Sequence, residues 1–134
     1  MVRPYDIEGN LSVIWGPSVF APCGLLFTNV RDLAQWIQLQ MNPNNLILAE
    51  TQIPTATISE KMKVGTGWHI VQSNKSQYIW HNGGTGTMGG YTSSAAFDPK
   101  TNRGVVILST ILASDTEGHL DKLCFGLLNC LNNP

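Results

Sequence analysis

The chain has 134 residues with a formal net charge of −1, and only 13% of its residues are charged. This length fits a single domain over residues 1–134, and the near-zero charge without a basic patch excludes nucleic acid as a partner. No apolar run approaches the roughly 20 residues that cross a bilayer. The first residues hold no apolar signal region, so an export signal would have to lie upstream, and the compartment is undetermined.

The charged share of 13% is about half of the usual ~25% of a soluble domain. Two explanations fit this composition equally well. Either much of the surface is covered by another part of a protein, or the exterior relies on uncharged Ser, Thr and Asn side chains. Composition leaves both open.

Residues 1–27 are rich in glycine and proline and are expected to be irregular. A helix is predicted over 28–41, because apolar residues then recur at helical spacing. Thr28 or Asn29 can cap its start, and Asp32 lies in the first turn, where the helix dipole favours an anion. The apolar positions of this helix are Val30, Leu33, Ala34, Ile37 and Met41.

Residues 46–66 are ambiguous and are expected to hold one short helix and a loop around Pro54. Beyond them the pattern changes to a period of two, which predicts a sheet over 67–111 with tight turns at 74–76 and 98–104. The β-branched run 105–108 is typical of a central buried strand. The predicted strands are 67–71, 77–81, 91–97 and 105–108.

A second helix is predicted over 116–131, and its apolar stripe is expected to cover the sheet. The stripe consists of Leu120, Leu123, Cys124, Leu127, Leu128 and Leu131. Sequential strands joined by tight turns favour an antiparallel sheet. The predicted fold is therefore α+β: about four antiparallel strands with an N-terminal helix and a C-terminal amphipathic helix packed on them.

The metal-ligating residue types form no recognisable site. Cys23, Cys124 and Cys130 match no zinc spacing and are expected to be small buried hydrophobes. His69 and His119 have no convincing partner, so neither a metal nor a cofactor is expected. The tryptophans, Trp15, Trp36, Trp68 and Trp80, are expected to be core or interface anchors.

Three segments in order resemble the serine β-lactamase and penicillin-binding-protein-like family, which includes class C β-lactamases, D-Ala-D-Ala carboxypeptidases and esterases. They are 21–36 with its Asp-Leu-Ala-Gln-Trp run, Gly65-Thr66-Gly67-Trp68, and 81–108, which starts with His-Asn-Gly-Gly. The resemblance covers nearly the whole chain beyond residue 20. It corresponds to the last portion, under half, of a family member, and so implies a partial β-lactamase-like fold.

The resemblance also implies an acyl-serine hydrolase acting on β-lactams, D-Ala peptides or esters. Family members use a Ser-x-x-Lys and a Tyr-x-Asn motif, and this chain contains neither. A serine hydroxyl is a weak nucleophile that needs an adjacent base. The chain is therefore expected to be inactive alone, and whether it counts as an enzyme is left open.

The site residues implied by the resemblance are His81, Gly83 and Gly84. His81 stands where the family has Lys or His, and Gly83 lets substrate lie against the strand. Gly84 would offer its N–H as one of two oxyanion donors. The alternative without a role in a site is that His81 is structural and the glycines form a flexible turn. The chain is also a few residues longer than the family pattern near 87–89, which puts the register of Gly84 in question.

Three kinds of partner are expected. In the family, N-terminal strands continue the sheet and a helical subdomain covers the helix 28–41, so an edge and an apolar face would otherwise be exposed. The missing N-terminal portion, or a second copy joined by dimerisation or strand exchange, would cover them. The third kind of partner is a peptide or β-lactam-like ligand. The alternative function is that of a non-catalytic peptide-binding or self-assembling module derived from the family. Family members are often periplasmic or extracytoplasmic.

Overall fold

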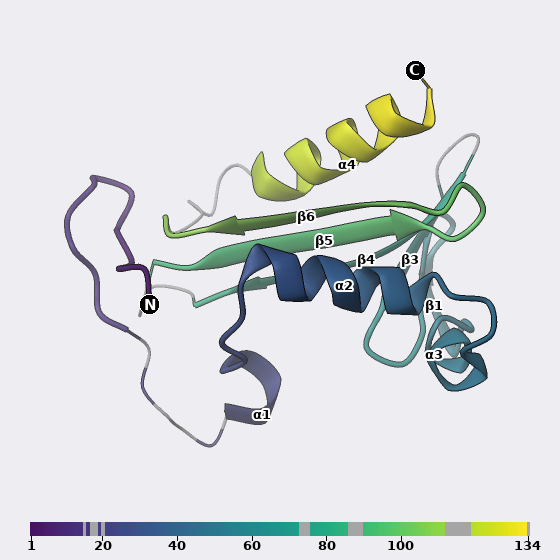
Figure 1. The fold of residues 1–134 in the computed structure, drawn as a ribbon, viewed down its shortest axis with the longest axis horizontal. Helices are drawn as coiled ribbons and strands as arrows, with labels where there is room; N and C mark the ends of the chain where they lie inside the picture. Colours follow the sequence, from purple (N-terminus) through teal and green to yellow (C-terminus); the bar gives the residue numbers. More distant parts are fainter. Residues whose placement is uncertain are drawn as a thin grey trace.

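A computed structural model of the chain describes residues 1–14, 16, 19, 21–72, 76–85, 90–111 and 119–133. In these residues a six-stranded antiparallel sheet runs in the order β1-β2-β3-β4-β5-β6, so every strand pairs with its neighbours in sequence. Helices lie on both faces (Figure 1). The strands are β1 (Ala56–Ser59), β2 (Met62–Val64), β3 (His69–Gln72), β4 (Gln77–Gly84), β5 (Thr92–Asp98) and β6 (Arg103–Ser109). The α+β prediction is confirmed, with two more strands than expected.

Helix α2 (Val30–Gln40) begins as its sequence predicts. Asn29, rather than Thr28, is the N-cap, and its side-chain oxygen accepts hydrogen bonds from the backbone N–H groups of Arg31 and Asp32, each at 3.0 Å. The Asn29 amide also donates to Asp32 Oδ2 at 2.7 Å. These bonds satisfy donors that a helix start leaves unpaired, which fixes where α2 begins.

The ambiguous segment 46–66 contains the expected short helix, α3 (Leu46–Thr51). The expected loop around Pro54 follows it at 52–55, but the segment also holds two unexpected strands, β1 and β2, which form a hairpin with a register shift between Thr57 and Ser59. The sequence of β1, Ala-Thr-Ile-Ser, does alternate apolar and polar residues, but the strand is only four residues long and all of its side chains are exposed.

Two hydrophobic cores lie on opposite faces of the sheet. On one face α2 packs on β6, and on the other α4 (His119–Asn132) packs on β5 and β6 (Figure 1). Alternation along β4 sends Ile79 to the first core and Tyr78 to the second. The first core contains Ile37, Ile70, Ile79, Ala95 and Phe97, and the second Tyr78, Ala96, Cys124 and Leu128.

Strand β6 is not central, as its β-branched sequence suggested, but ends the sheet. Its apolar run instead reflects coverage on both faces: Val106 packs against the α2 core, whereas Val105 and Ile107 pack against the α4 core. A strand covered on both sides reads as continuously hydrophobic wherever it stands in a sheet.

The apolar stripe of α4 only partly faces the sheet. Cys124 and Leu128 are fully buried, while Leu123, Leu127 and Leu131 are exposed, because neighbouring residues on a helix point about 100° apart. The expectation for the cysteines holds for Cys124 and is wrong for Cys23 and Cys130, which are both exposed.

The N-terminal segment is largely irregular, as predicted, apart from the single turn α1 (Ala21–Gly24). Figure 1 shows the N-terminus beside the ends of β5 and β6. There Tyr5 N–H donates to Thr110 O at 2.7 Å, and the Tyr91 hydroxyl donates to Val2 O at 2.6 Å. Among the described residues, no helix is long and apolar enough to span a bilayer.

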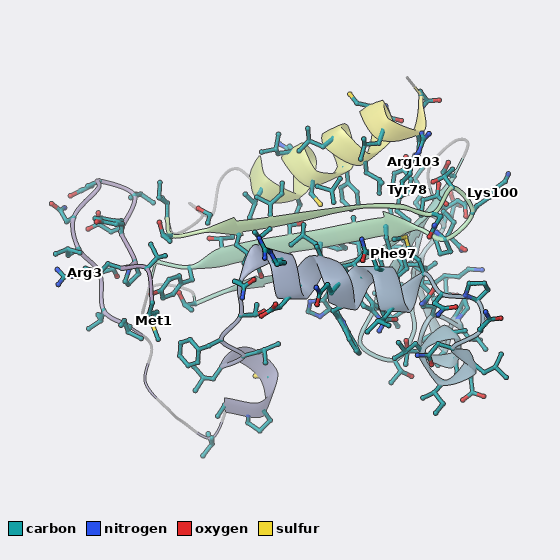
Figure 2. All side chains as sticks on the ribbon, viewed as in Figure 1. Met1, Arg3, Tyr78, Phe97, Lys100 and Arg103 are labelled. Carbon is teal, nitrogen blue, oxygen red and sulfur yellow. The ribbon has the colours of Figure 1, made fainter. Side chains whose placement is uncertain are left out.

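Both ends of α4 are tied to the sheet by polar groups. At the C-terminal end, Asn132 donates to the buried Asp98 at 3.0 Å and accepts from the Thr101 hydroxyl at 2.8 Å. Figure 2 shows Arg103 beside the same end of α4, where its guanidinium donates to Leu131 O. The predicted turn after β5 is thereby held against the last turn of the helix.

Candidate functional site

The second half of β4 extends past the strand beside it. Strand β3 pairs with β4 only as far as His69 opposite Trp80. Beyond that point 81–84 pairs with β5 alone, ending with Gly84 opposite Thr92. Within the described part of the chain, the other edge of this segment has no strand neighbour. The three predicted site residues, His81, Gly83 and Gly84, therefore lie together on an open strand edge.

The hydrogen-bond alternation of the β4–β5 ladder fixes which way the Gly84 amide points. Thr85 N–H donates to Tyr91 O at 3.1 Å, so these two residues form a hydrogen-bonded pair. Bonded and non-bonded pairs alternate in an antiparallel ladder, so Gly84 and Thr92 are a non-bonded pair. The N–H and C=O of Gly84 therefore point away from β5, toward the open edge.

The same alternation applies two residues earlier along β4. Asn82 and Ser94 are also a non-bonded pair, whereas His81 and Gly83 bond to β5 through Ala95 and Ser93. The open edge thus presents the backbone groups of Asn82 and Gly84. Two N–H groups and two C=O groups at this spacing are what an added peptide strand pairs with.

The two glycines differ in their surroundings. A Cβ on Gly83 would lie 2.9 Å from Ser93 Oγ, whereas one on Gly84 would meet only Tyr91 O at 3.8 Å. A side chain on Gly83 would therefore need the Ser93 hydroxyl to shift, whereas Gly84 has room for one. The prediction of a flexible turn is wrong for these two glycines, which lie in β4, and residues 86–89, including the extra length near 87–89, fall outside the described residues.

His81 is exposed and borders an aromatic group at the start of β3. Its ring centroid lies 5.7 Å from that of His69 in a stacked arrangement and 6.5 Å from that of Trp68. The His69 ring also lies 5.0 Å from Trp80. Burial, and secondarily the charge of His81, lower the pKa of His69 below its usual value, and its buried Nδ1 has no hydrogen-bond partner.

Sequence reasoning treated these two histidines separately. In the structure His69 is paired with Trp80, and His81 follows one residue beyond this pair. Of the tryptophans, Trp68 and Trp80 pack against the two cores as expected, whereas Trp36 is exposed on α2. Trp15 and the side chain of His119 lie outside the described residues.

Behind the open edge, Asp121 in the first turn of α4 binds three side chains from two strands. Its Oδ1 accepts from the Ser94 hydroxyl at 2.7 Å and from Trp80 Nε1 at 3.3 Å. Its Oδ2 accepts from the Asn82 amide at 2.8 Å. Sequence reasoning missed Asp121, because 39 residues separate it from Asn82 and no local pattern links them.

Ser94 is the described serine most closely joined to an ionisable group, yet it is poorly placed for acyl transfer. Its side chain is fully buried beneath α4, and its hydroxyl donates a hydrogen bond to Asp121. Access to a substrate carbonyl is lacking there. In the part of the chain that the structure covers, no group of three or more His, Cys, Asp or Glu residues could hold a metal ion.

An antiparallel sheet covered by helices on both faces, with a His-Asn-Gly-Gly strand at an open edge, defines an α+β domain of the β-lactamase type. Residues 3–123 match the Beta-lactamase family model, so the chain belongs to the β-lactamase family. It is 26% identical over 116 residues to "Protein flp" of Staphylococcus aureus strains NCTC 8325 / PS 47, COL and N315. That similarity covers 80% of this chain and 22% of each relative, so the chain spans about a fifth of their length.

Proposed function

We propose that the chain supplies the substrate-facing strand of an acyl-serine hydrolase site and is inactive alone. The observation that carries this proposal is the open edge of β4, where the backbone N–H of Gly84 points away from β5. Such an N–H is a suitable oxyanion donor, because it is fixed in direction before any substrate arrives. One donor of this kind contributes about 3 kcal/mol to transition-state stabilisation.

The reaction proposed is the hydrolysis of a β-lactam, a D-Ala peptide or an ester. A serine oxygen attacks the carbonyl carbon, the C–N or C–O bond breaks, and water then releases the acyl group from the serine. His81 faces the reacting groups at the edge, and Gly83 keeps the strand surface flat. The serine and its base come from outside the printed residues, because this chain contains neither Ser-x-x-Lys nor Tyr-x-Asn.

The partner proposed is the N-terminal part of a longer hydrolase or, failing that, a second copy of this chain. Apolar side chains on the α1 and α2 side support a covering partner, since Leu26 is 84% exposed and Phe27 and Trp36 are also exposed. β6 offers a second edge, beside which a groove of about 450 Å³ runs between α2 and β6. Light scattering over a range of concentrations separates a self-associating chain from a monomer awaiting its other part.

Catalysis is tested by joining the chain to the upstream segment of its reading frame that carries Ser-x-x-Lys and Tyr-x-Asn. The chain alone should not hydrolyse a chromogenic β-lactam or a short-chain nitrophenyl ester, whereas the joined protein should. Turnover by the purified chain alone, surviving removal of contaminants, contradicts the proposal. An upstream segment without these motifs contradicts it as well.

The role of Gly84 is tested by Gly84→Pro in the joined protein. Proline removes the N–H, and edge strands tolerate it where that N–H faces outward. We expect a folded protein with kcat reduced about 100-fold, the effect of losing one oxyanion donor. The matched control is Gly126→Ala on α4, where a Cβ meets nothing within 4 Å. A folded Gly84→Pro protein with an unchanged kcat would contradict the site.

A non-catalytic peptide-binding module is the second candidate, because the paired outward groups of Asn82 and Gly84 suit strand addition without chemistry. It predicts saturable binding of a D-Ala-D-Ala-terminated peptide to the chain alone, followed as amide shifts at 81–84 in a 15N-labelled sample. Binding without turnover, in both the chain and the joined protein, favours this candidate over the hydrolase.

A further inference from the structure

We infer that Asp121 is a positioning residue that holds the open half of β4 in place from behind. The inference deepens the proposed function, on which its consequence for ligand binding rests. Its structural part stands on the hydrogen bonds of Asp121 alone and is tested separately.

The position of Asp121 suits a clamp on this strand. Asn82 and Ser94 face each other as a non-bonded pair, which brings their side chains closer together than a bonded pair would. The carboxylate of Asp121 receives a hydrogen bond from each of them, at 2.8 Å and 2.7 Å. One group on α4 therefore ties β4 to β5 at the point where β4 has lost its β3 neighbour.

The bonds to the Asp121 carboxylate differ in exposure, since the bond from Ser94 is shielded whereas the bond from Asn82 lies at the exposed edge. Hydrogen bonds to an ionised carboxylate are roughly twice as strong as neutral ones. Ser94 is fully buried, which limits competition from water, and Trp80 Nε1 donates both to Ser94 Oγ at 3.1 Å and to Asp121. The carboxylate also lies in the first turn of α4, where the helix dipole favours a negative charge.

The consequence of this clamp concerns the backbone of Asn82, the residue whose side chain Asp121 holds. The Asn82 side chain is held by Asp121 while its backbone N–H points to the open edge, two residues from that of Gly84. An edge strand paired on one side only would otherwise twist and fray. Fixing Asn82 fixes the direction of both outward N–H groups, which is the preorganisation that an oxyanion donor or an added strand needs.

The test measures amide hydrogen exchange by NMR in the 15N-labelled chain. The probes are the amides of His81 and Gly83, which bond to β5. Asp121→Ala is expected to accelerate their exchange about tenfold or more, because a hydrogen bond to a charged group is lost. The amides of Ile79 and Phe97 in the core should change far less.

A control variant separates positioning from a general loss of stability. Asn132→Ala removes the bonds to Asp98 and Thr101 at the other end of α4. It should accelerate exchange near 98–103 and leave His81 and Gly83 unchanged. Equal acceleration of His81 and Gly83 by both variants would overturn the inference, as would no acceleration by Asp121→Ala.

A charge exchange provides the rescue. Asn82→Asp alone sets two carboxylates against each other and should loosen the strand as Asp121→Ala does. Adding Asp121→Asn restores one donor and one acceptor across the same gap, and the amide oxygen introduced on α4 can still accept from Ser94 and Trp80. Exchange at Gly83 should return to within about threefold of the parent rate. Failure of this rescue contradicts the clamp.

Ligand binding is then compared among the same variants. If the clamp and the proposed function both hold, Asp121→Ala weakens binding of the D-Ala-D-Ala-terminated peptide about tenfold, and the double exchange restores it. If exchange responds as expected but the parent chain binds no peptide, the peptide-binding role fails while the positioning role of Asp121 stands. If exchange does not respond, the positioning role fails whatever the peptide does.

Discussion

Gly83 and Ser93 face each other across β4 and β5, and a Cβ on Gly83 would come within 2.9 Å of Ser93 Oγ. The neighbouring Gly84 has no such constraint, since the nearest atom to its Cβ would be Tyr91 O at 3.8 Å. The two adjacent glycines of the site strand thus have different surroundings. Packing disfavours a side chain at Gly83, whereas the open edge gives Gly84 its proposed role.

Alanine at these two positions should therefore have unequal effects. We expect Gly83→Ala to lower the free energy of unfolding by about 1 kcal/mol relative to Gly84→Ala, because the added methyl crowds a hydroxyl. Urea denaturation of each variant measures the difference. Adding Ser93→Ala to Gly83→Ala should abolish it, and a difference that persists without the hydroxyl would mean that crowding is not the cause.

Stability should fall in acid because of His69. Its pKa is lowered in the folded state, first by burial and then by His81, so the unfolded chain takes up the proton first as the pH falls. Neutral His69 contributes fully to the free energy of unfolding above about pH 6.5, which is its pKa in the unfolded chain. This contribution is lost as the pH drops from there through the lower folded pKa. His69→Gln should therefore weaken the pH dependence of the free energy of unfolding between pH 7 and about pH 5.

His81→Gln serves as the matched control for this titration. Removing the second imidazole eliminates the smaller cause, so the pKa of His69, followed by NMR of its ring protons, should move only part of the way back to its usual value. A complete return would mean that burial is not the larger cause. No movement at all would mean that the two rings do not interact.

The buried Asp98 should be a major contributor to stability. It accepts hydrogen bonds from Lys100 N–H at 2.9 Å and from the Asn132 amide at 3.0 Å. Asp98→Ala leaves both donors without an acceptor, so we expect a loss of about 2–4 kcal/mol by urea denaturation. Asp98→Asn keeps one acceptor oxygen and should lose less. An equal loss would show that volume, and not hydrogen bonding, decides the effect.

The cysteines should differ in reactivity toward a thiol reagent. Burial raises the pKa of the Cys124 thiol, and its side chain is fully buried under α4, whereas Cys130 is exposed on the same helix. Iodoacetamide at pH 8 should modify Cys130 within minutes and Cys124 only at the rate of unfolding, because the thiolate is the reactive form. Peptide mass spectrometry measures both rates. Rapid labelling of Cys124 in the folded protein would contradict its burial.

Local patterns predicted much of this fold. The spacing of Ile37 and Met41 with the cap at Asn29 predicted α2, and alternation predicted β4 and β5 to within a few residues. These features depend on short-range forces, namely helix hydrogen bonding, capping and the two-residue period of a strand. The β1–β2 hairpin was missed although β1, Ala-Thr-Ile-Ser, has the two-residue period, since the strand is only four residues long and all of its side chains are exposed.

The sequence by itself determined the family, the order of the main elements and the candidate residues His81, Gly83 and Gly84. Only the tertiary structure decided that β3 stops at His69, that the Gly84 N–H points outward, and that Asp121 reaches Asn82 across 39 residues. The physical reason is that the open edge of β4, the strand register and the hydrogen bonds of Asp121 each depend on how separate segments pack together. They arise from pairing and packing over long separations, which the periodicity of a single segment does not encode.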